Sequence, residues 1–286
     1  MRLKRLKMRL RTITSAIIIA ITVPLILFSQ YLVYPIVLAL FSLIAVFELL
    51  RVMGAHKKWI ISVPAYIIAP ALPLCSYLVN NVEIEKLGYM LWALAVVFGY
   101  MLYAMSVAVF SKGTLSISTV AEVFLTFAYV VVSFTSLCLV RYLDHGMFLL
   151  GFVVIAAWIC DSAAYIVGSL FGRHKLIPDV SPKKTVEGAI GGVVVTAIAA
   201  MLYGFIVDLA IEGITPDYLV LGLSGLILSV VAQLGDLIAS LIKREHGVKD
   251  FGTLLPGHGG IMDRFDSLLA VSTIAMMICV AFPPFK

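Results

Sequence analysis

The chain has 286 residues, of which 62% are hydrophobic and only 13% are charged. These fractions differ strongly from those of an average soluble protein and are typical of a membrane protein. The formal net charge is +5. Since no stretch interleaves basic and aromatic residues, the charge does not indicate a nucleic-acid-binding protein.

Apolar runs of about 20 residues, the length that spans a bilayer, follow one another along nearly the whole sequence. They predict an all-α polytopic protein of about nine transmembrane helices, with no room for a large soluble domain. We therefore expect one integral-membrane domain over residues 1–286, with less specific patterns in 1–145 than in 146–286. The expected spans are 12–29, 31–52, 59–79, 88–110, 117–140, 147–171, 187–207, 218–242 and 266–284.

The first run follows "MRLKRLKMRLR", a basic segment like the start of a secretory signal. No small-residue cleavage pattern closes the run near "LFSQYLVYP". The sequence therefore predicts a retained signal anchor.

The basic residues predict the orientation, because Lys and Arg beside transmembrane spans remain in the cytoplasm. With the N-terminus in the cytoplasm, 18 of the 21 basic residues lie on that side, and only Lys86, Arg141 and Lys286 do not. We expect a multi-pass protein of the cytoplasmic membrane with a cytoplasmic N-terminus. Its net charge would also favour anionic lipid head groups.

The four cysteines lie singly within apolar runs, without the close spacing of zinc or redox motifs. They are expected to be small core residues. They are Cys75, Cys138, Cys160 and Cys279.

Acidic residues inside apolar runs are costly and mark either ion pairs or functional sites. Glu48 is followed three residues later by Arg51, a spacing that favours a structural ion pair. Glu122 could line a cavity or bond a neighbouring helix, and both alternatives stay open. Asp161 and Asp236 are stronger functional candidates.

Asp236, Ser240 and Lys243 are spaced so that they share one face of a helix, and Asp161 and Tyr165 are likewise four residues apart. Both runs continue into basic segments that are expected at the cytoplasmic surface. A structural role is an alternative for both aspartates. The pattern favours function more strongly for Asp236 than for Asp161.

The segment "GRHKLIPDVSPKKTVEGAIGG" places Ser181 and Thr185 just before an expected helix start at Glu187. Backbone amides at a helix start, together with lysines, can bind an anion. Ordinary retention of positive charge in the cytoplasm is the alternative, but it does not explain the glycines and hydroxyls. The basic residues of the segment are Arg173, Lys175, Lys183 and Lys184.

The segment "KDFGTLLPGHGGIMDRFDS", residues 249–267, is polar and rich in glycine within an apolar chain. Glycines let backbone N–H groups approach a ligand closely. Asp263 and Asp266 are three residues apart on one helix face, and a hard cation between them would offset their repulsion. Asp236 could complete such a site. The pattern predicts a polyphosphate, a magnesium ion and a lipid meeting at the cytoplasmic face.

Residues 240–266, "SLIKREHGVKDFGTLLPGHGGIMDRFD", resemble the signature of the phosphatidate cytidylyltransferases, also called CDP-diacylglycerol synthases. "WICDSAAYIVGSLFGRHKL" and "SPKKTVEGAIGG" are similar to two further blocks of that family. The likeness covers roughly the C-terminal half. Val186 is a departure, since many members have an aromatic residue or isoleucine there.

The resemblance implies transfer of a cytidylyl group from CTP to phosphatidic acid by a helical bundle with a polar funnel that faces the cytoplasm. It implies a Mg²⁺ centre held mainly by Asp236 and Asp263, with Asp266 as a further ligand, and leaves open a second, monovalent cation such as K⁺. It also suggests a homodimer. The implied catalytic residues are Asp236, Asp263, Lys243, Arg244 and Arg264. The candidate substrate-binding residues are Ser240, Lys249, Asp250, His258, Gly259, Gly260, Ser181, Lys183, Lys184 and Asp161.

Three other classes of function are alternatives to this one. An ion-coupled transporter would carry its charges near the membrane midplane on helices related by a repeat, whereas these charges gather at one face. A structural scaffold leaves the glycine and aspartate cluster unexplained. An enzyme that uses CTP on an ether-lipid or prenyl phosphate, or a CTP-dependent lipid kinase, stays open because residues that contact lipid tails are simply apolar.

Overall fold

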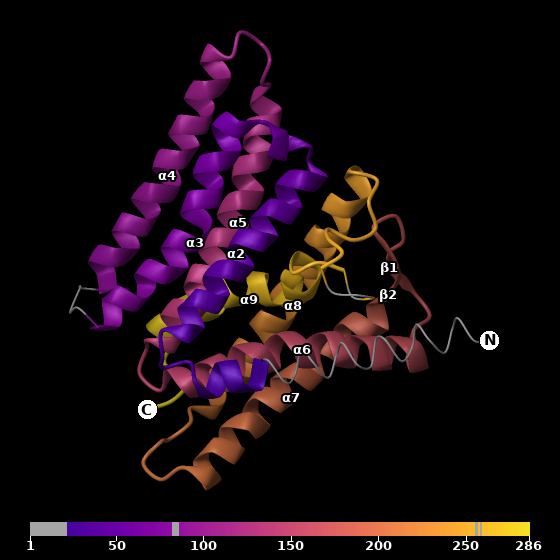
Figure 1. Cartoon of the computed structure of the whole chain (residues 1–286). Coiled ribbons are helices and arrows are strands. Elements are labelled where there is room, and N and C mark those ends of the chain that lie inside the picture. The colour runs from indigo at the N-terminus through magenta and orange to yellow at the C-terminus, as the bar shows by residue number, and fades with distance from the viewer. Residues whose placement is uncertain (1–21, 82–85, 255–256, 258) are drawn as a thin grey trace. The chain divides into compact units, whose positions relative to one another are not determined.

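The computed structural model describes residues 22–81, 86–254, 257 and 259–286, and these are mostly α-helical (Figure 1). Within them, eight helices are long and apolar enough to cross a membrane. They match eight of the nine expected spans to within four residues, and most of the expected span 12–29 lies outside the described residues. The helices are α2 (Val33–Val52), α3 (Trp59–Asn81), α4 (Lys86–Phe110), α5 (Ile117–Arg141), α6 (Gly146–Phe171), α7 (Val186–Ala210), α8 (Tyr218–Glu245) and α9 (Met262–Ala281).

The chain divides into two compact units, which are described separately. The first unit comprises Met1–Cys138 and Val248–Arg264, and the second comprises Leu139–Gly247 and Phe265–Lys286. The glycine-rich segment therefore belongs with the N-terminal helices rather than only with the C-terminal half. A single domain over the whole chain remains a prediction.

In the first unit, α2 packs against α3, and α3 packs against α4. Helix α3 continues through Pro64, although proline has no N–H to pair with the carbonyl of Ile60. The hydroxyl of Tyr103 on α4 donates to that carbonyl over 2.8 Å. A neighbouring helix thus supplies the hydrogen bond that the lipid hydrocarbon cannot offer to this backbone carbonyl.

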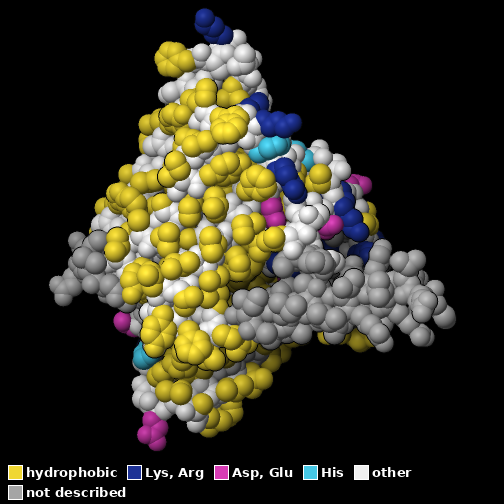
Figure 2. Space-filling view, viewed as in Figure 1, with side chains coloured by type: hydrophobic (Ala, Val, Ile, Leu, Met, Phe, Trp, Pro, Cys, Tyr) yellow, Lys and Arg dark blue, Asp and Glu magenta, His cyan; other side chains and the backbone are white. Residues whose placement is uncertain are grey.

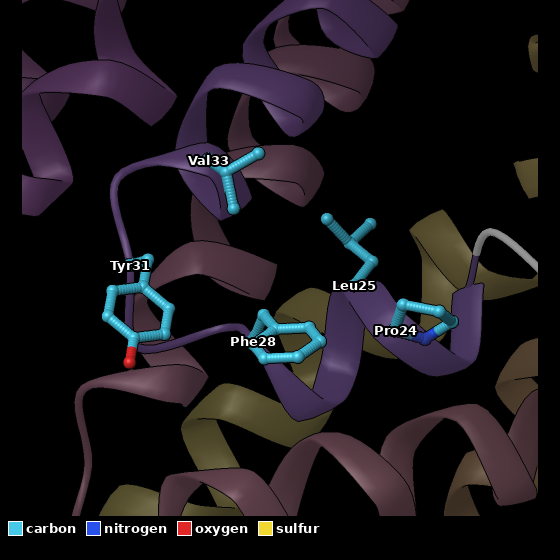
Figure 3. Close-up of a pocket in the computed structure, with 5 residues that line it drawn as sticks. All are labelled: Pro24, Leu25, Phe28, Tyr31 and Val33. Atoms are coloured by element: carbon cyan, nitrogen blue, oxygen red, sulfur yellow. The ribbon is translucent and has the colours of Figure 1, made fainter.

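The outer faces of α3 and α4 carry many hydrophobic side chains (Figure 2). Trp59 is 75% exposed and Phe110 is 82% exposed. Exposed apolar surface of this kind is expected where helices face lipid. Among the described residues, Pro24, Leu25, Phe28, Tyr31 and Val33 line a pocket of about 380 Å³ in the same unit (Figure 3). None of these five side chains is charged.

In the second unit, α6, α7 and α8 pack against one another. Glycines let α6 and α7 approach closely, because a Cβ on Gly188 would lie 2.6 Å from the carbonyl oxygen of Ala164. A Cβ on Gly191 would lie equally close to Val167. The small residues at the start of α7 therefore pack against α6 of the same chain, one of the two uses that small residues allow.

The segment between α6 and α7 contains a two-stranded antiparallel sheet that the sequence analysis did not predict. Strand β1 (Lys175–Ile177) pairs with β2 (Ser181–Thr185), with Ile177 opposite Ser181. The turn includes Pro178 and Asp179, residue types that favour turns. Helix α7 begins one residue before the expected Glu187, and the hydroxyl of its N-cap residue Thr185 accepts the N–H of Gly188 over 3.2 Å.

The four cysteines are free and three of them are buried, which agrees with their prediction as core residues.

We expect Gly188→Ala to destabilise the second unit by about 1–3 kcal/mol, because the new methyl group must push α6 and α7 apart. The midpoint of thermal unfolding in detergent would measure this loss. Gly99→Ala on α4 is the matched control, since a Cβ there has no neighbour within 4 Å. Equal midpoints for the two variants would contradict close packing at Gly188.

Candidate active site

Asp263 lies at the start of α9, and its carboxylate is folded back over the glycine-rich segment of the first unit. Its Oδ2 accepts the N–H groups of Phe251 (2.7 Å), Gly252 (3.4 Å) and Gly260 (2.9 Å). The side chain is 6% exposed. Gly259 has φ +83°, and a Cβ there would lie 2.6 Å from Oδ2. The hydrogen bonds to Asp263 therefore fix the backbone conformation of this segment.

The other candidate residues of the first unit flank the same segment. Lys249, Asp250 and Arg264 are exposed, whereas Gly260 is buried and Gly259 is half-buried. The exposed charged groups can reach a ligand, while the glycines keep the backbone compact. His258 lies outside the described residues.

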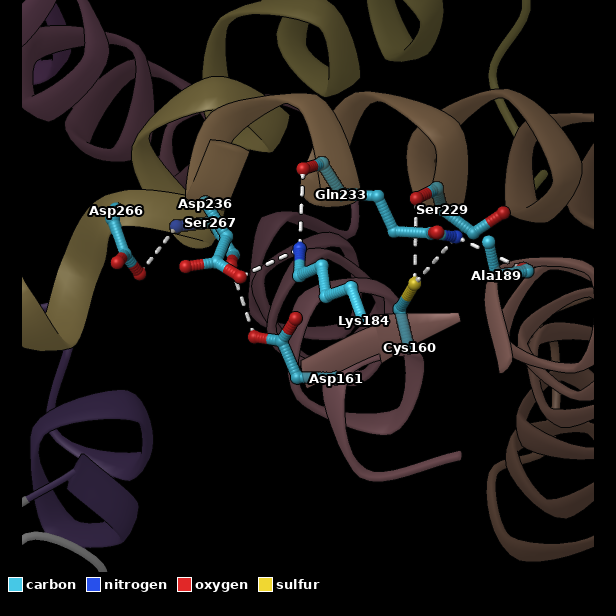
Figure 4. Close-up of polar contacts among 9 residues, drawn as sticks. All are labelled: Cys160, Asp161, Lys184, Ala189, Ser229, Gln233, Asp236, Asp266 and Ser267. Carbon is cyan, nitrogen blue, oxygen red and sulfur yellow. Dashed lines mark hydrogen bonds and ion pairs between the residues drawn. The ribbon is translucent and has the colours of Figure 1, made fainter. Parts of the chain in front are cut away.

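In the second unit, Asp161 of α6, Asp236 of α8 and Asp266 of α9 lie close together (Figure 4). The hydroxyl of Ser267 donates to Asp161 Oδ2 over 2.9 Å. Asp266 is close enough to Asp161 and Asp236 for its carboxylate to be repelled by both. The structure thus brings three of the predicted residues into one acidic cluster.

Lys184 of β2 places a positive charge in this cluster. Its Nζ lies 2.6 Å from Asp236 Oδ2 and 3.5 Å from the carbonyl oxygen of Gln233. The amide of Gln233 in turn donates to the carbonyl oxygen of Ala189 on α7 over 3.1 Å (Figure 4). These contacts tie β2 and the start of α7 to α8. They explain why a lysine far from Asp236 in sequence becomes its partner.

Further basic and hydroxyl groups lie on the same segments. Lys243 is close enough to Asp266 to attract it, and Arg244 Nε donates to the carbonyl oxygen of Val180 over 3.4 Å. Ser181 and Ser240 are half-buried, and Lys183 is exposed. All of these predicted residues belong to the second unit.

The sequence pattern did not predict a role for Glu187 or Ser267. Glu187 accepts the backbone N–H groups of Arg173 (3.0 Å) and His174 (3.2 Å) and pairs with His174 Nδ1 at 2.6 Å. The signal in the sequence was an acidic residue in the first turn of a helix, where it can bond the preceding loop.

Glu122 is half-buried on α5. Its two alternatives, lining a cavity or bonding a neighbouring helix, stay open.

Among the described residues, no group of three or more His, Cys, Asp or Glu side chains is arranged to hold a metal ion. Magnesium commonly uses only one or two carboxylates and completes its shell with water and substrate phosphates. The oxygen donors of Asp236 and Asp266 fit that kind of ion.

Candidate membrane helices that carry a cluster of carboxylates, lysines and hydroxyls fit a membrane enzyme that acts on phosphorylated substrates. The profile described as Cytidylyltransferase family matches residues 9–282. The chain therefore belongs to the cytidylyltransferase family.

Several curated relatives carry the name phosphatidate cytidylyltransferase. The protein of Staphylococcus haemolyticus is 34% identical over 280 residues, which cover 96% of this chain and 99% of the relative. That of Bacillus subtilis is 36% identical over 244 residues, covering 84% and 86% of the two chains. That of Staphylococcus aureus is 34% identical over 276 residues, covering 96% and 99%.

We expect Lys184→Met to lower the turnover of CTP by about tenfold or more, because Asp236 loses a charged partner at 2.6 Å. Initial rates of the purified protein in detergent would measure this. Lys175→Met removes an exposed lysine of β1 and serves as the control, for which we expect the wild-type rate. Equal rates for both variants would remove Lys184 from the site.

Proposed function

We propose that the chain transfers the cytidylyl group of CTP to phosphatidic acid, forming CDP-diacylglycerol and pyrophosphate for phospholipid synthesis. The main support is the similarity, over almost the full chain, to relatives named phosphatidate cytidylyltransferase. Eight candidate membrane helices among the described residues suit a substrate whose acyl chains stay in the bilayer. The acidic and basic cluster of the second unit suits substrates that carry phosphates.

The reaction joins two polyanions. An oxygen of the phosphatidate phosphate attacks the α-phosphorus of CTP, a new P–O bond forms there, and the bond to the bridging oxygen of the β-phosphate breaks to release pyrophosphate. The main barriers are charge repulsion and misalignment. The attacking phosphate monoester is already ionised at neutral pH, so the reaction needs no general base. His258 then has a positioning role rather than a basic one.

The basic side chains reduce the repulsion between the substrates. Lys184 already lies beside a carboxylate of the cluster, so a phosphate that enters can share its ammonium group with Asp236. Arginine and lysine bind phosphates as strong hydrogen-bond donors. The residues proposed to hold the phosphates are Lys183, Lys184, Lys243, Arg244, Lys249 and Arg264.

A magnesium ion would supply charge neutralisation on the transferred group and on pyrophosphate. Asp236 and Asp266 would hold it, since both carboxylates belong to one cluster. Asp263 as a principal ligand remains a prediction, and in the structure its Oδ2 accepts three backbone N–H groups. A second, monovalent cation and a homodimer also remain predictions.

The active face is proposed to lie in the cytoplasm, where CTP is available. The distribution of Lys and Arg supports this orientation. Residues 249–262 would then be cytoplasmic, and the turn between α7 and α8 would lie on the opposite side.

Purified wild-type protein in detergent should make CDP-diacylglycerol and pyrophosphate from phosphatidic acid, CTP and magnesium. Asp236→Asn should lower the rate by about a hundredfold or more, because it removes a charge from the centre of the cluster. Asp208→Asn makes the same chemical change at the far end of α7 and should keep the wild-type rate. A folded wild type that forms neither product would refute the proposed reaction.

Competition between lipids separates this function from the alternative of another lipid phosphate. Phosphatidic acid should compete with an ether-lipid or prenyl phosphate for the same CTP turnover and be converted fastest. Preferred conversion of a prenyl phosphate would change the assigned acceptor but keep the nucleotide chemistry.

Single cysteines in a background without other cysteines would test the orientation. Thr253→Cys should react with a membrane-impermeant maleimide only from the cytoplasmic side, because Thr253 is exposed in the glycine-rich segment. Glu212→Cys, exposed in the turn after α7, should react only from the opposite side. Labelling of both from one side would refute the orientation.

A further inference from the structure

Glu48 is a buried acid of α2 whose carboxylate bonds the backbone of the glycine-rich segment, more than 200 residues away in the sequence. Its Oε1 accepts the N–H of Ile261 over 3.1 Å, and its Oε2 accepts the N–H of Met262 over 2.9 Å. The side chain is only 4% exposed. The two oxygens of this buried carboxylate thus accept hydrogen bonds from two adjacent backbone N–H groups.

These two groups stand at the start of α9, whose first residue is Met262. The first N–H groups of a helix have no partner within the helix and are usually capped by a nearby side chain. A carboxylate at this position also meets the positive end of the helix dipole. Glu48 therefore caps α9 from a different helix.

The glycines of the segment pack directly on this carboxylate. A Cβ on Gly252 or on Gly260 would overlap the Glu48 side chain. Arg51, one turn further along α2, donates from Nη2 to the carbonyl oxygen of Phe251 over 2.9 Å. Helix α2 thus holds the segment at both ends, at Phe251 and at Ile261 and Met262.

This arrangement differs from the ion pair that the spacing of Glu48 and Arg51 predicted. Arg51 is close enough to attract Glu48 electrostatically. However, the hydrogen bonds described above join each of these two side chains to the backbone of the glycine-rich segment. A sequence pattern within one helix could not reveal a partner on a distant segment.

We propose that Glu48 is a positioning residue for the nucleotide, which it affects by fixing the backbone of Gly259, Gly260, Ile261 and Met262. The proposal rests on the proposed function and on the expectation that Gly259 and Gly260 of this segment bind the substrate CTP. It assigns a role in CTP recognition to the N-terminal half of the chain. Glu48 does not touch the substrate and acts only through the segment.

Glu48→Gln tests this directly, because glutamine keeps the size of the side chain but has one acceptor oxygen instead of two. One of the two buried N–H groups then faces an NH₂ group and is left unpaired. We expect the KM for CTP to rise about tenfold while the KM for phosphatidic acid stays at its wild-type value. The Kd for CTP, measured by calorimetric titration, should rise by a similar factor.

Two further variants make the result specific. Glu48→Asp keeps both acceptors on a shorter side chain and should give a KM for CTP between those of wild type and Glu48→Gln. Ser42→Ala, on the same helix, removes a buried hydroxyl that has no hydrogen-bond partner among the described residues. It should leave both KM values unchanged.

A purely structural role would lower the thermal midpoint and the amount of folded Glu48→Gln protein without changing the KM or Kd for CTP. That result would overturn the proposal. If Glu48→Gln cannot be purified in folded form, Glu48→Asp decides the question by the same two constants. A wild type that binds CTP but forms no CDP-diacylglycerol would refute the proposed reaction alone, and the ratio of Kd values would still test the role of Glu48.

Discussion

Hydrogen bonding of the backbone is the constraint on which the shape of the glycine-rich segment depends. Phe251, Gly252, Gly260, Ile261 and Met262 all present N–H groups that are buried and belong to no strand or completed helical turn. Such groups are costly unless a partner is supplied. Two buried carboxylates, those of Asp263 and Glu48, accept all five. The charges of these acids are thereby offset by backbone dipoles, and the backbone gains a defined shape.

In the second unit, side chains rather than backbone groups offset the negative charge of the acidic cluster. Asp161, Asp236 and Asp266 come from three different helices, and the repulsion of Asp266 by the other two carboxylates opposes close packing of those helices. Lys184 offsets part of the negative charge at Asp236, and the hydroxyl of Ser267 binds Asp161. A metal ion bound here would neutralise more of this negative charge, and Lys184 would then be able to bind a phosphate.

The two units also show how glycine serves different purposes in one chain. Gly188 and Gly191 bring α6 and α7 together within regular helices, where the lack of a side chain allows close packing. Gly259 instead adopts a positive φ, and Gly260 leaves room for a carboxylate. A stripe of small residues does not identify its partner helix, so the sequence alone does not distinguish packing within a chain from packing between chains.

The sequence by itself determined the membrane class and the positions of eight helices to within four residues, and it predicted which charged residues belong to the candidate site. It could do so because a span needs a long apolar run and because charge inside such a run is rare. Only the tertiary structure decided which groups these charged side chains contact. It placed Lys184 on Asp236, Glu48 on the start of α9 and Asp263 on the glycine-rich backbone, and it formed the β1–β2 hairpin. These contacts join residues far apart in the chain, and no local pattern encodes which distant backbone group a carboxylate will bond.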